Sequence, residues 1–217
     1  QVTLTASSSA PGYVFSHWIG GESNLLTTVA TVKMTGHPTV KAVFVEATDI
    51  STIEELQAIG NMAGNYRLTR DIDATATTNW NGGAGFAPIG RMFTGIFDGN
   101  GHVIKGLTIN RPGQYGVGLF CDVESGGSVR RVGLEGGSVQ GGDSVGALAG
   151  YAGACVFEEC FSTSDVLGAD YVGGLIGVIW SNGAVARVIK CYATGNVTAQ
   201  SVSLGGTNAG GLIGILY

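Results

Sequence analysis

Two aspartates stand at matching places before two glycine-rich segments of this chain and are its candidates for holding a cation. They are Asp143 and Asp170, and Gln114 and Asn208 precede two further segments of the same kind. Carboxylate and amide oxygens are the ligands that Ca²⁺ takes in proteins. The same residue types cap turns through Asx hydrogen bonds. Asp143 and Asp170 are therefore predicted to cap a corner, with Ca²⁺ binding as the alternative.

The charged pairs of the chain do not predict catalysis. A hydrolase or lyase of polysaccharides needs carboxylates gathered on one face. Glu158-Glu159 and Arg130-Arg131 are adjacent pairs, so in a strand the two members of each would point to opposite faces. Asp98 and His102 flank a Gly-Asn-Gly turn, and turn chemistry explains them. We therefore predict a protein that is not an enzyme.

Two tryptophans are candidates for ligand binding. Trp80 and Trp180 are flanked by asparagine or serine, as is typical of indole rings that stack on sugars. The alternative is that each ring packs onto the fold and anchors a loop, because a large apolar ring gains free energy from burial.

Two cysteines, Cys160 and Cys191, occupy one position of a repeat in successive copies. In neighbouring strands their Cα atoms would lie about 5 Å apart, within disulfide range. Either a disulfide or a ladder of buried thiols fits this placement, and the thiol ladder is the simpler of the two.

The composition identifies the kind of chain that must position these residues. Of 217 residues 38 are glycine, only 12% are charged, and the net charge is −5. A hydrophobic content of 44% excludes disorder, and the lack of a basic stripe argues against nucleic acid as a partner. No apolar run reaches the roughly 20 residues of a membrane span. These features predict a soluble, glycine-rich β protein.

Residues 1–47 are predicted to form a small β module. Its apolar and polar residues alternate, which is typical of strands, and turn-forming residues separate the runs. We expect a small core built around Phe15, Trp18, Met34 and Phe44. The expected strands are Val2–Thr5, Tyr13–Trp18, Val29–Met34 and Thr39–Phe44, with turns that include Gly36-His37-Pro38.

One helix is expected, at about 51–60, where it would cap the start of the second region, residues 48–217. Ser51 and Glu54 fit a capping box, with Ser51 as N-cap. Ile53, Leu56 and Ile59 share one face, and Gly60 can end the helix. A short helix in this place is suited to cover the first edge of a β array.

From Tyr66 onward the chain contains internal copies that predict a β-solenoid. The copies are short runs bounded by glycine, which exclude helical repeats. Turns of about 27 residues would give roughly five or six turns, with a loop insertion at 199–204. Three registers support stacking: Leu119, Leu148, Leu175 and Leu212; Leu107, Leu134, Phe161 and Tyr192; Val139, Val166 and Val197.

The two regions resemble known families. Val2-Thr3-Leu4-Thr5-Ala6, Pro11–Trp18 and Val40–Phe44 resemble the divergent internalin-type B repeat, a small β module of bacterial surface proteins. Gly173-Gly174-Leu175-Ile176-Gly177, together with its copies at 146–150 and 210–214, resembles the GLUG motif. This second resemblance implies a right-handed parallel β-helix in secreted or surface-displayed proteins. The first copy departs from the motif, with Phe120-Cys121 where it has an aliphatic residue and glycine.

The expected role is that of an extracellular, secreted or cell-surface attached scaffold, stalk or adhesin-like segment. Its partners would be a surface protein or glycan of a host or neighbouring cell. One alternative is a filament subunit that associates with itself through its C-terminal turn, and another is a carbohydrate-binding or carbohydrate-degrading β-helix. The residues of that assembly surface would be Leu212, Ile213, Ile215, Leu216 and Tyr217.

Overall fold

The computed structural model describes residues 2–7, 10–20, 27–32, 39–200 and 208–217. Three features expected from the sequence lie outside these ranges: Met34, the turn at 36–38, and most of the loop insertion expected at 199–204. Within the described ranges, no helix is both long and apolar enough to cross a membrane.

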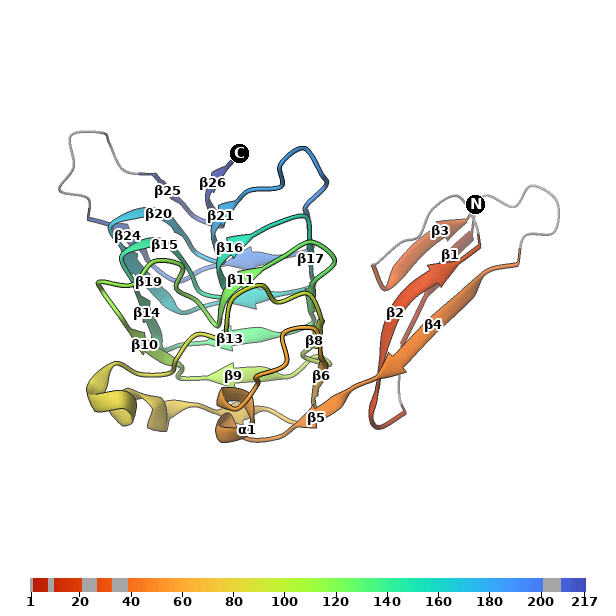
Figure 1. Cartoon of the computed structure of the whole chain (residues 1–217), viewed down its shortest axis with the longest axis horizontal. Coiled ribbons are helices and arrows are strands. Elements are labelled where there is room, and N and C mark those ends of the chain that lie inside the picture. Colours follow the sequence, from red (N-terminus) through yellow and green to blue (C-terminus); the bar gives the residue numbers. More distant parts are fainter. Residues whose placement is uncertain (1, 8–9, 21–26, 33–38, 201–207) are drawn as a thin grey trace.

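The described strands of the N-terminal region form two small antiparallel sheets (Figure 1). Phe15 and Trp18 are buried with two alanines, and their rings lie 5.4 Å apart. Phe44 was expected in this core but is 37% exposed and meets the Phe15 ring with its edge. Phe15 is buried because the Arg130 side chain also covers its ring. The strands are β1 (Val2–Thr5) with β3 (Val29–Val32), and β2 (Tyr13–Ile19) with β4 (Lys41–Glu46).

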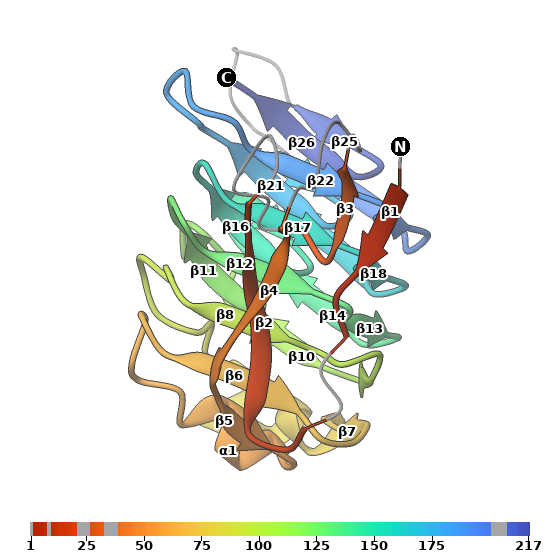
Figure 2. The ribbon, with the colours of Figure 1, turned by 90° about the vertical axis from the view of Figure 1, so that its right-hand side faces the viewer.

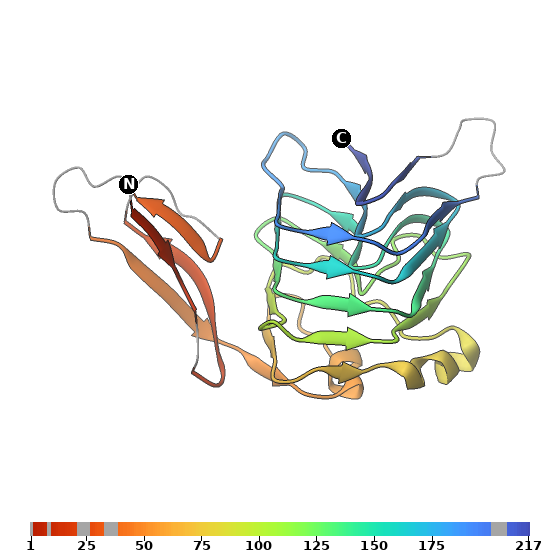
Figure 3. The ribbon, with the colours of Figure 1, turned by 180° about the vertical axis from the view of Figure 1, so that it is seen from behind.

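From Thr48 the chain winds into a stack of parallel strands (Figures 1 and 3). A complete turn visits five sheets, numbered I to V in the order in which the chain meets them within a turn. The predicted all-β solenoid is confirmed. The expected number of turns was too high: sheet I has six strands, but sheets III and V have four each, which makes about four turns.

The bounds of the strands are as follows. Sheet I contains β5 (Thr48–Ile50), β6 (Asn65–Leu68), β8 (Ile96–Asp98), β12 (Ser128–Arg130), β17 (Val156–Glu158) and β22 (Arg187–Ile189). Sheet II contains β7 (Ile72–Asp73), β9 (Val103–Lys105), β13 (Gly133–Glu135), β18 (Phe161–Ser162) and β23 (Tyr192–Ala193). Sheet III contains β10 (Thr108–Asn110), β14 (Ser138–Gln140), β19 (Asp165–Gly168) and β24 (Val197–Ala199). Sheet IV contains β15 (Asp143–Gly146), β20 (Asp170–Gly173) and β25 (Ala209–Gly210). Sheet V contains β11 (Phe120–Val123), β16 (Ala149–Ala152), β21 (Ile176–Ile179) and β26 (Ile213–Leu216).

Two of the three predicted registers are confirmed. Ala149 pairs with Ile176 and Ile176 with Ile213, so the leucine before each strand of sheet V stacks on its neighbour. The valines of sheet III pair as predicted.

The third register is correct only at its end. Phe161 pairs with Tyr192, and their rings are stacked with centroids 5.2 Å apart. Leu134 pairs with Ile104 of β9 rather than with Leu107, so the beginning of this register is wrong. The two apolar residues at 104 and 107 lie on either side of a corner, and only the first belongs to sheet II.

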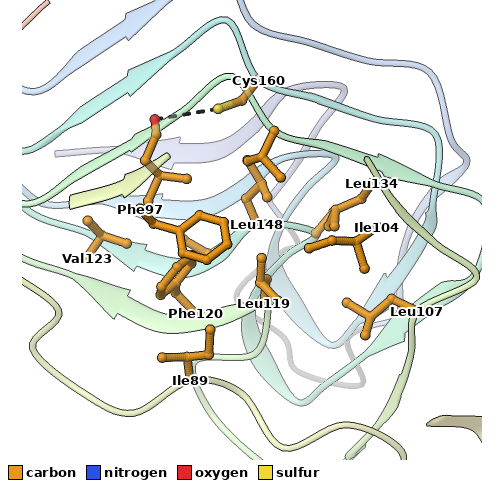
Figure 4. Close-up of a cluster of buried hydrophobic side chains, with 14 of the residues drawn as sticks. Ile89, Phe97, Ile104, Leu107, Leu119, Phe120, Val123, Leu134, Leu148 and Cys160 are labelled. Atoms are coloured by element: carbon orange, nitrogen blue, oxygen red, sulfur yellow. Dashed lines mark hydrogen bonds between the residues drawn. The ribbon is translucent and has the colours of Figure 1, made fainter. Parts of the chain in front are cut away.

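The interior of the solenoid is filled by stacked apolar side chains (Figure 4). Phe97 and Phe120 are both fully buried, with ring centroids 5.4 Å apart at an interplanar angle of 75°. Leu119 and Leu148, which directly precede strands β11 and β16 of sheet V, lie beside these rings, and Leu134 faces them from sheet II. Burial of side chains of this size contributes roughly 1.5–3 kcal/mol each.

The predicted helix is present but begins one residue later and is shorter. Helix α1 spans Ile53–Gln57 and lies at the β5 end of the stack (Figure 1). Thr52, not Ser51, is the N-cap, and its hydroxyl accepts a hydrogen bond from the Glu55 amide. The Glu55 carboxylate accepts in return from the Thr52 amide at 3.1 Å. The helix ends before Gly60, with Ala58 as its C-cap.

Replacing Thr52 with alanine should destabilise the start of α1. The hydroxyl that satisfies the Glu55 amide is lost, which costs about 0.5–2 kcal/mol at helix N-caps. Chemical denaturation followed by circular dichroism measures this loss. The matched variant Ser51→Ala should change stability less, and equal losses in both variants would contradict Thr52 as the N-cap.

Sheets IV and V approach each other so closely that a side chain cannot fit between their backbones. Gly150, Gly177 and Gly214 occupy one position of successive strands of sheet V. A Cβ on Gly177 would lie 2.6 Å from the Val145 amide nitrogen, and one on Gly214 would lie 2.6 Å from the Tyr171 carbonyl carbon. The repeated glycine is therefore required by the crossing of two backbones.

Cys121 takes the place of this glycine in the first strand of sheet V. Residue 121 precedes Gly150 in the same column, and no described strand of sheet IV lies beneath it. The space that the later turns lack is present here, which explains why the first copy departs from the glycine pattern.

A second helical element was not expected. The 3-10 segment η1 spans Thr75–Gly83 and is interrupted at Trp80, where the backbone becomes extended. Asn81 follows with a φ of 52°, in the left-handed region that asparagine tolerates.

Candidate functional site

The most extensive polar constellation is a column of charged residues on the outer face of sheet I. Each of five successive strands contributes one charged residue, and the sign of the charge alternates from strand to strand. Each residue is paired in register with the next. We call this column the charge ladder. In order from β5 to β17 its members are Asp49, Arg67, Asp98, Arg130 and Glu158.

The N-terminal module covers the charge ladder, with β2 and β4 running across the strands of sheet I (Figure 2). The Glu158 carboxylate accepts hydrogen bonds from the Thr28 amide at 2.9 Å and from the Thr28 hydroxyl at 3.0 Å. Arg130 donates to the Phe15 carbonyl, and its guanidinium lies 5.4 Å from the centre of the Phe15 ring. Arg67 donates to the Ala10 carbonyl at 2.8 Å.

The centre of the ladder is withdrawn from water. The side chains of Asp98 and Arg130 are both 0% exposed, and the Arg130 Nε lies 3.2 Å from the Asp98 carboxylate. Arg131 adds a second contact to that carboxylate at 2.6 Å. Burial lowers the pKa of the Arg130 guanidinium, while the neighbouring Asp98 charge acts in the opposite direction. An arginine stays cationic in this setting. Each of the two buried charges therefore needs the other to offset the free-energy cost of its own burial.

The expectation that Arg130-Arg131 would point to opposite faces is wrong. Arg131 has a φ of 50°, so the chain turns a corner immediately after Arg130 and strand alternation ends there. Both guanidinium groups therefore reach Asp98. Glu159 lies at the same corner of the next turn with a φ of 54°, and it pairs with Lys190 at 2.7 Å.

Asp98 does more than the predicted turn chemistry. Its carboxylate caps the Asn100 amide at 2.8 Å, as expected of a turn, and also holds two arginines. His102 does not join it but lies 3.3 Å from Asp71. A charged residue recurs at one place in successive turns, but its sign alternates and the intervals are unequal, so the sequence does not mark the column as a repeat.

Asp143 and Asp170 are paired in register on sheet IV. The Asp170 Oδ1 accepts hydrogen bonds from the Asn208 amide at 2.7 Å, from the Asn208 side chain at 3.2 Å and from the Tyr171 amide at 2.8 Å. Gln114 and Asn208 fall one residue out of the column, as the neighbouring pairs Val117–Val145 and Val172–Ala209 show. Within the described ranges, no group of three or more His, Cys, Asp or Glu side chains gathers as a metal site would.

These contacts predict that calcium will not stabilise the chain. A site built only from Asp143 and Asp170 lacks the six to eight oxygen ligands that Ca²⁺ takes. Thermal unfolding in millimolar CaCl₂ and in EDTA should give the same midpoint. A rise in midpoint with calcium that disappears in the Asp143→Asn variant would instead establish a calcium site.

The two candidate tryptophans lie in different environments. Trp80 is partly buried and packs against the core, as the anchoring interpretation expects. Trp180 is 62% exposed, and its ring lies 5.4 Å from that of Tyr217, which in turn is 6.4 Å from Tyr171.

The predicted assembly surface lies on and around β26. Among the described strands, β26 pairs with β21 alone. Leu212, Ile213 and Ile215 are partly buried, whereas Leu216 is 67% exposed and Tyr217 57%.

Cys160 and Cys191 are neighbours in successive turns, and both are free thiols. The Cys160 amide donates to the Cys191 sulfur at 3.4 Å, and the Cys160 thiol donates to the Val129 carbonyl at 3.5 Å (Figure 4). Burial raises the pKa of Cys160, and the hydrogen bond with Cys160 lowers the pKa of Cys191.

Comparison with known proteins places the module in a family. The chain is similar to halomucin of Haloquadratum walsbyi, with 38% identity over 172 residues, which are 74% of this chain and 2% of halomucin. It is also similar to a putative Gly-rich membrane protein of Evansella cellulosilytica, with 38% identity over 110 residues, 46% of this chain and 13% of that protein. The chain thus spans a small part of these relatives, and no solved structure matches it. Residues 1–48 match the divergent InlB B-repeat domain, so the chain carries a domain of this family next to its β-solenoid.

Proposed function

We propose that the chain is a non-enzymatic scaffold or stalk segment of a large extracellular or cell-surface protein, with an adhesin-like role. In this proposal residues 1–47 are the B-repeat module and residues 48–217 a GLUG-type solenoid. The B-repeat domain fits a surface protein, and the names of the relatives, a halomucin and a membrane protein, agree with a place at the cell boundary.

The observation that carries this proposal is the buried joint between the module and the solenoid. A flexible tether would leave the two parts free to turn, whereas the charge ladder fixes the module through Phe15 and Thr28. The joint holds one geometry because a tilt of the module would break the hydrogen bonds that Phe15 and Thr28 make to the charged side chains of Arg130 and Glu158. A stiff unit of this kind suits a protein that transmits force or holds a binding part away from a surface.

The GLUG assignment is supported by the physical roles of the repeated glycines and leucines. The glycines at 150, 177 and 214 allow two backbones to cross. The leucines at 119, 148 and 175, each directly before a strand of sheet V, are fully buried in the core.

The non-enzymatic role is supported by what the carboxylates already do. Asp98 and Glu158, the acidic members of the ladder that contact or adjoin Arg130, are buried and hydrogen-bonded. The Glu158 oxygens bind Thr28 of the module and the Asp98 oxygens bind arginines, so neither carboxylate is free to act on a substrate.

Labelling of intact cells tests the surface location. Antibodies raised against this chain should bind unpermeabilised cells that produce the parent protein, and external protease should remove the signal. Labelling that appears only after permeabilisation would overturn the proposal.

A second candidate role is self-association through the β26 surface. It is favoured by the exposure of Leu216 and Tyr217 beside a strand edge. Light scattering over a range of concentrations tests it: mass that grows with concentration and falls in the Leu216→Lys variant supports assembly. A constant monomer mass rejects it for this chain.

A further inference from the structure

A groove of about 610 Å³ lies on sheet III, within the size range of ligand sites. It lies on the side of the solenoid away from the module (Figure 1). Four strands cross its floor, from β10 to β24. At about 4.8 Å between neighbours, they extend over roughly 14 Å.

The lining of the groove is hydroxyl and amide in character. One column of its floor aligns Asn110, Gln140, Leu167 and Thr198, and a second aligns Thr108, Ser138 and Asp165. No lysine or arginine is among the described residues that line it. The single carboxylate, Asp165, is engaged by the Asn196 amide and side chain, both at 2.9 Å.

The backbone of the groove floor is not available to a ligand. β14 and β19 each have a paired strand on both sides, so their amides and carbonyls are used within the sheet. An extended peptide therefore cannot add as a further strand there. A ligand must bond to the side chains, which offer both donors and acceptors, as the hydroxyl groups of a sugar do.

We propose that the groove on sheet III binds a linear, uncharged oligosaccharide. A polyanion is disfavoured, because the described part of the lining has no cation and the chain carries a net charge of −5. Leu167 supplies the apolar patch on which the CH face of a sugar ring can rest. This inference names a ligand class for the adhesin-like role proposed above. It rests on that role only for the extracellular location in which the sugar would be met.

Titration of the intact, ¹⁵N-labelled chain with cellohexaose, maltohexaose and a heparin hexasaccharide tests the proposal. At least one neutral probe should shift amide signals of β10, β14, β19 and β24. Gln140→Ala should weaken that binding about fivefold, the loss of one hydrogen bond of about 1 kcal/mol. Gln114→Ala changes the same residue type outside the groove and should leave binding unchanged.

Three outcomes would overturn the proposal. They are no shift with either neutral probe, shifts confined to other sheets, or binding of heparin in preference to both neutral probes. None of these outcomes depends on where the parent protein is located, so a failure of ligand binding and a failure of cell-surface labelling can be told apart.

Discussion

Replacing Asp98 with alanine should lower the free energy of unfolding by about 3–5 kcal/mol, the loss expected when one partner of a buried ion pair is removed. Arg130 and Arg131 would then face each other without the carboxylate that both contact. Because the Arg130 side chain is 0% exposed, water cannot compensate. For a chain of this length the melting temperature should fall by roughly 6–20 °C.

The matched control for this variant is an exposed ion pair. Lys105 lies 3.0 Å from Asp71, and both side chains are about half exposed. Lys105→Ala should cost less than about 1 kcal/mol, as is usual for surface pairs. Equal melting temperatures for Asp98→Ala and Lys105→Ala would show that the charge ladder is not buried in solution.

Replacing Gly177 with alanine should destabilise the solenoid by about 3 kcal/mol, near the upper part of the usual range for overpacking. The added Cβ would lie 2.6–2.7 Å from backbone atoms of Val145, Ser144 and Gly150, which cannot rotate away as a side chain can. Sheets IV and V would have to separate. Urea unfolding followed by circular dichroism measures the loss.

Gly211→Ala is the control within the same repeated motif. An added Cβ at Gly211 meets nothing within 4 Å, so stability should change by no more than about 0.5 kcal/mol. Comparable losses at Gly177 and Gly211 would show that the general effect of replacing a glycine, rather than the close crossing of the backbones, explains the destabilisation.

The stacking of the solenoid could be predicted because one residue type recurs where packing demands it. Leucines fill the same interior position before each strand of sheet V, and glycines recur where sheets IV and V cross. The register through Leu107 failed because that turn is longer than the expected 27 residues: Leu134 pairs with Ile104, which lies 30 residues earlier (134 − 104). An apolar residue on the wrong side of a corner looks the same in sequence.

The charge ladder could not be predicted in the same way. Its members alternate in sign, so no residue type repeats from one strand to the next, and the intervals between them are unequal. The left-handed corner at Arg131 has no glycine to mark it. The cap of α1 was misplaced by one residue because Ser51 and Thr52 each stand at capping-box spacing from a glutamate.

Residual dipolar couplings of the intact chain test most directly the central claim, that the module is fixed to the solenoid. If the joint is rigid, couplings from β2 and β4 and from sheets I–V should fit one alignment tensor. In Asp98→Ala the tensor of the module should shrink relative to that of the solenoid. Two unequal tensors in the unaltered chain would contradict the account, because they would show that the module moves independently of the charge ladder.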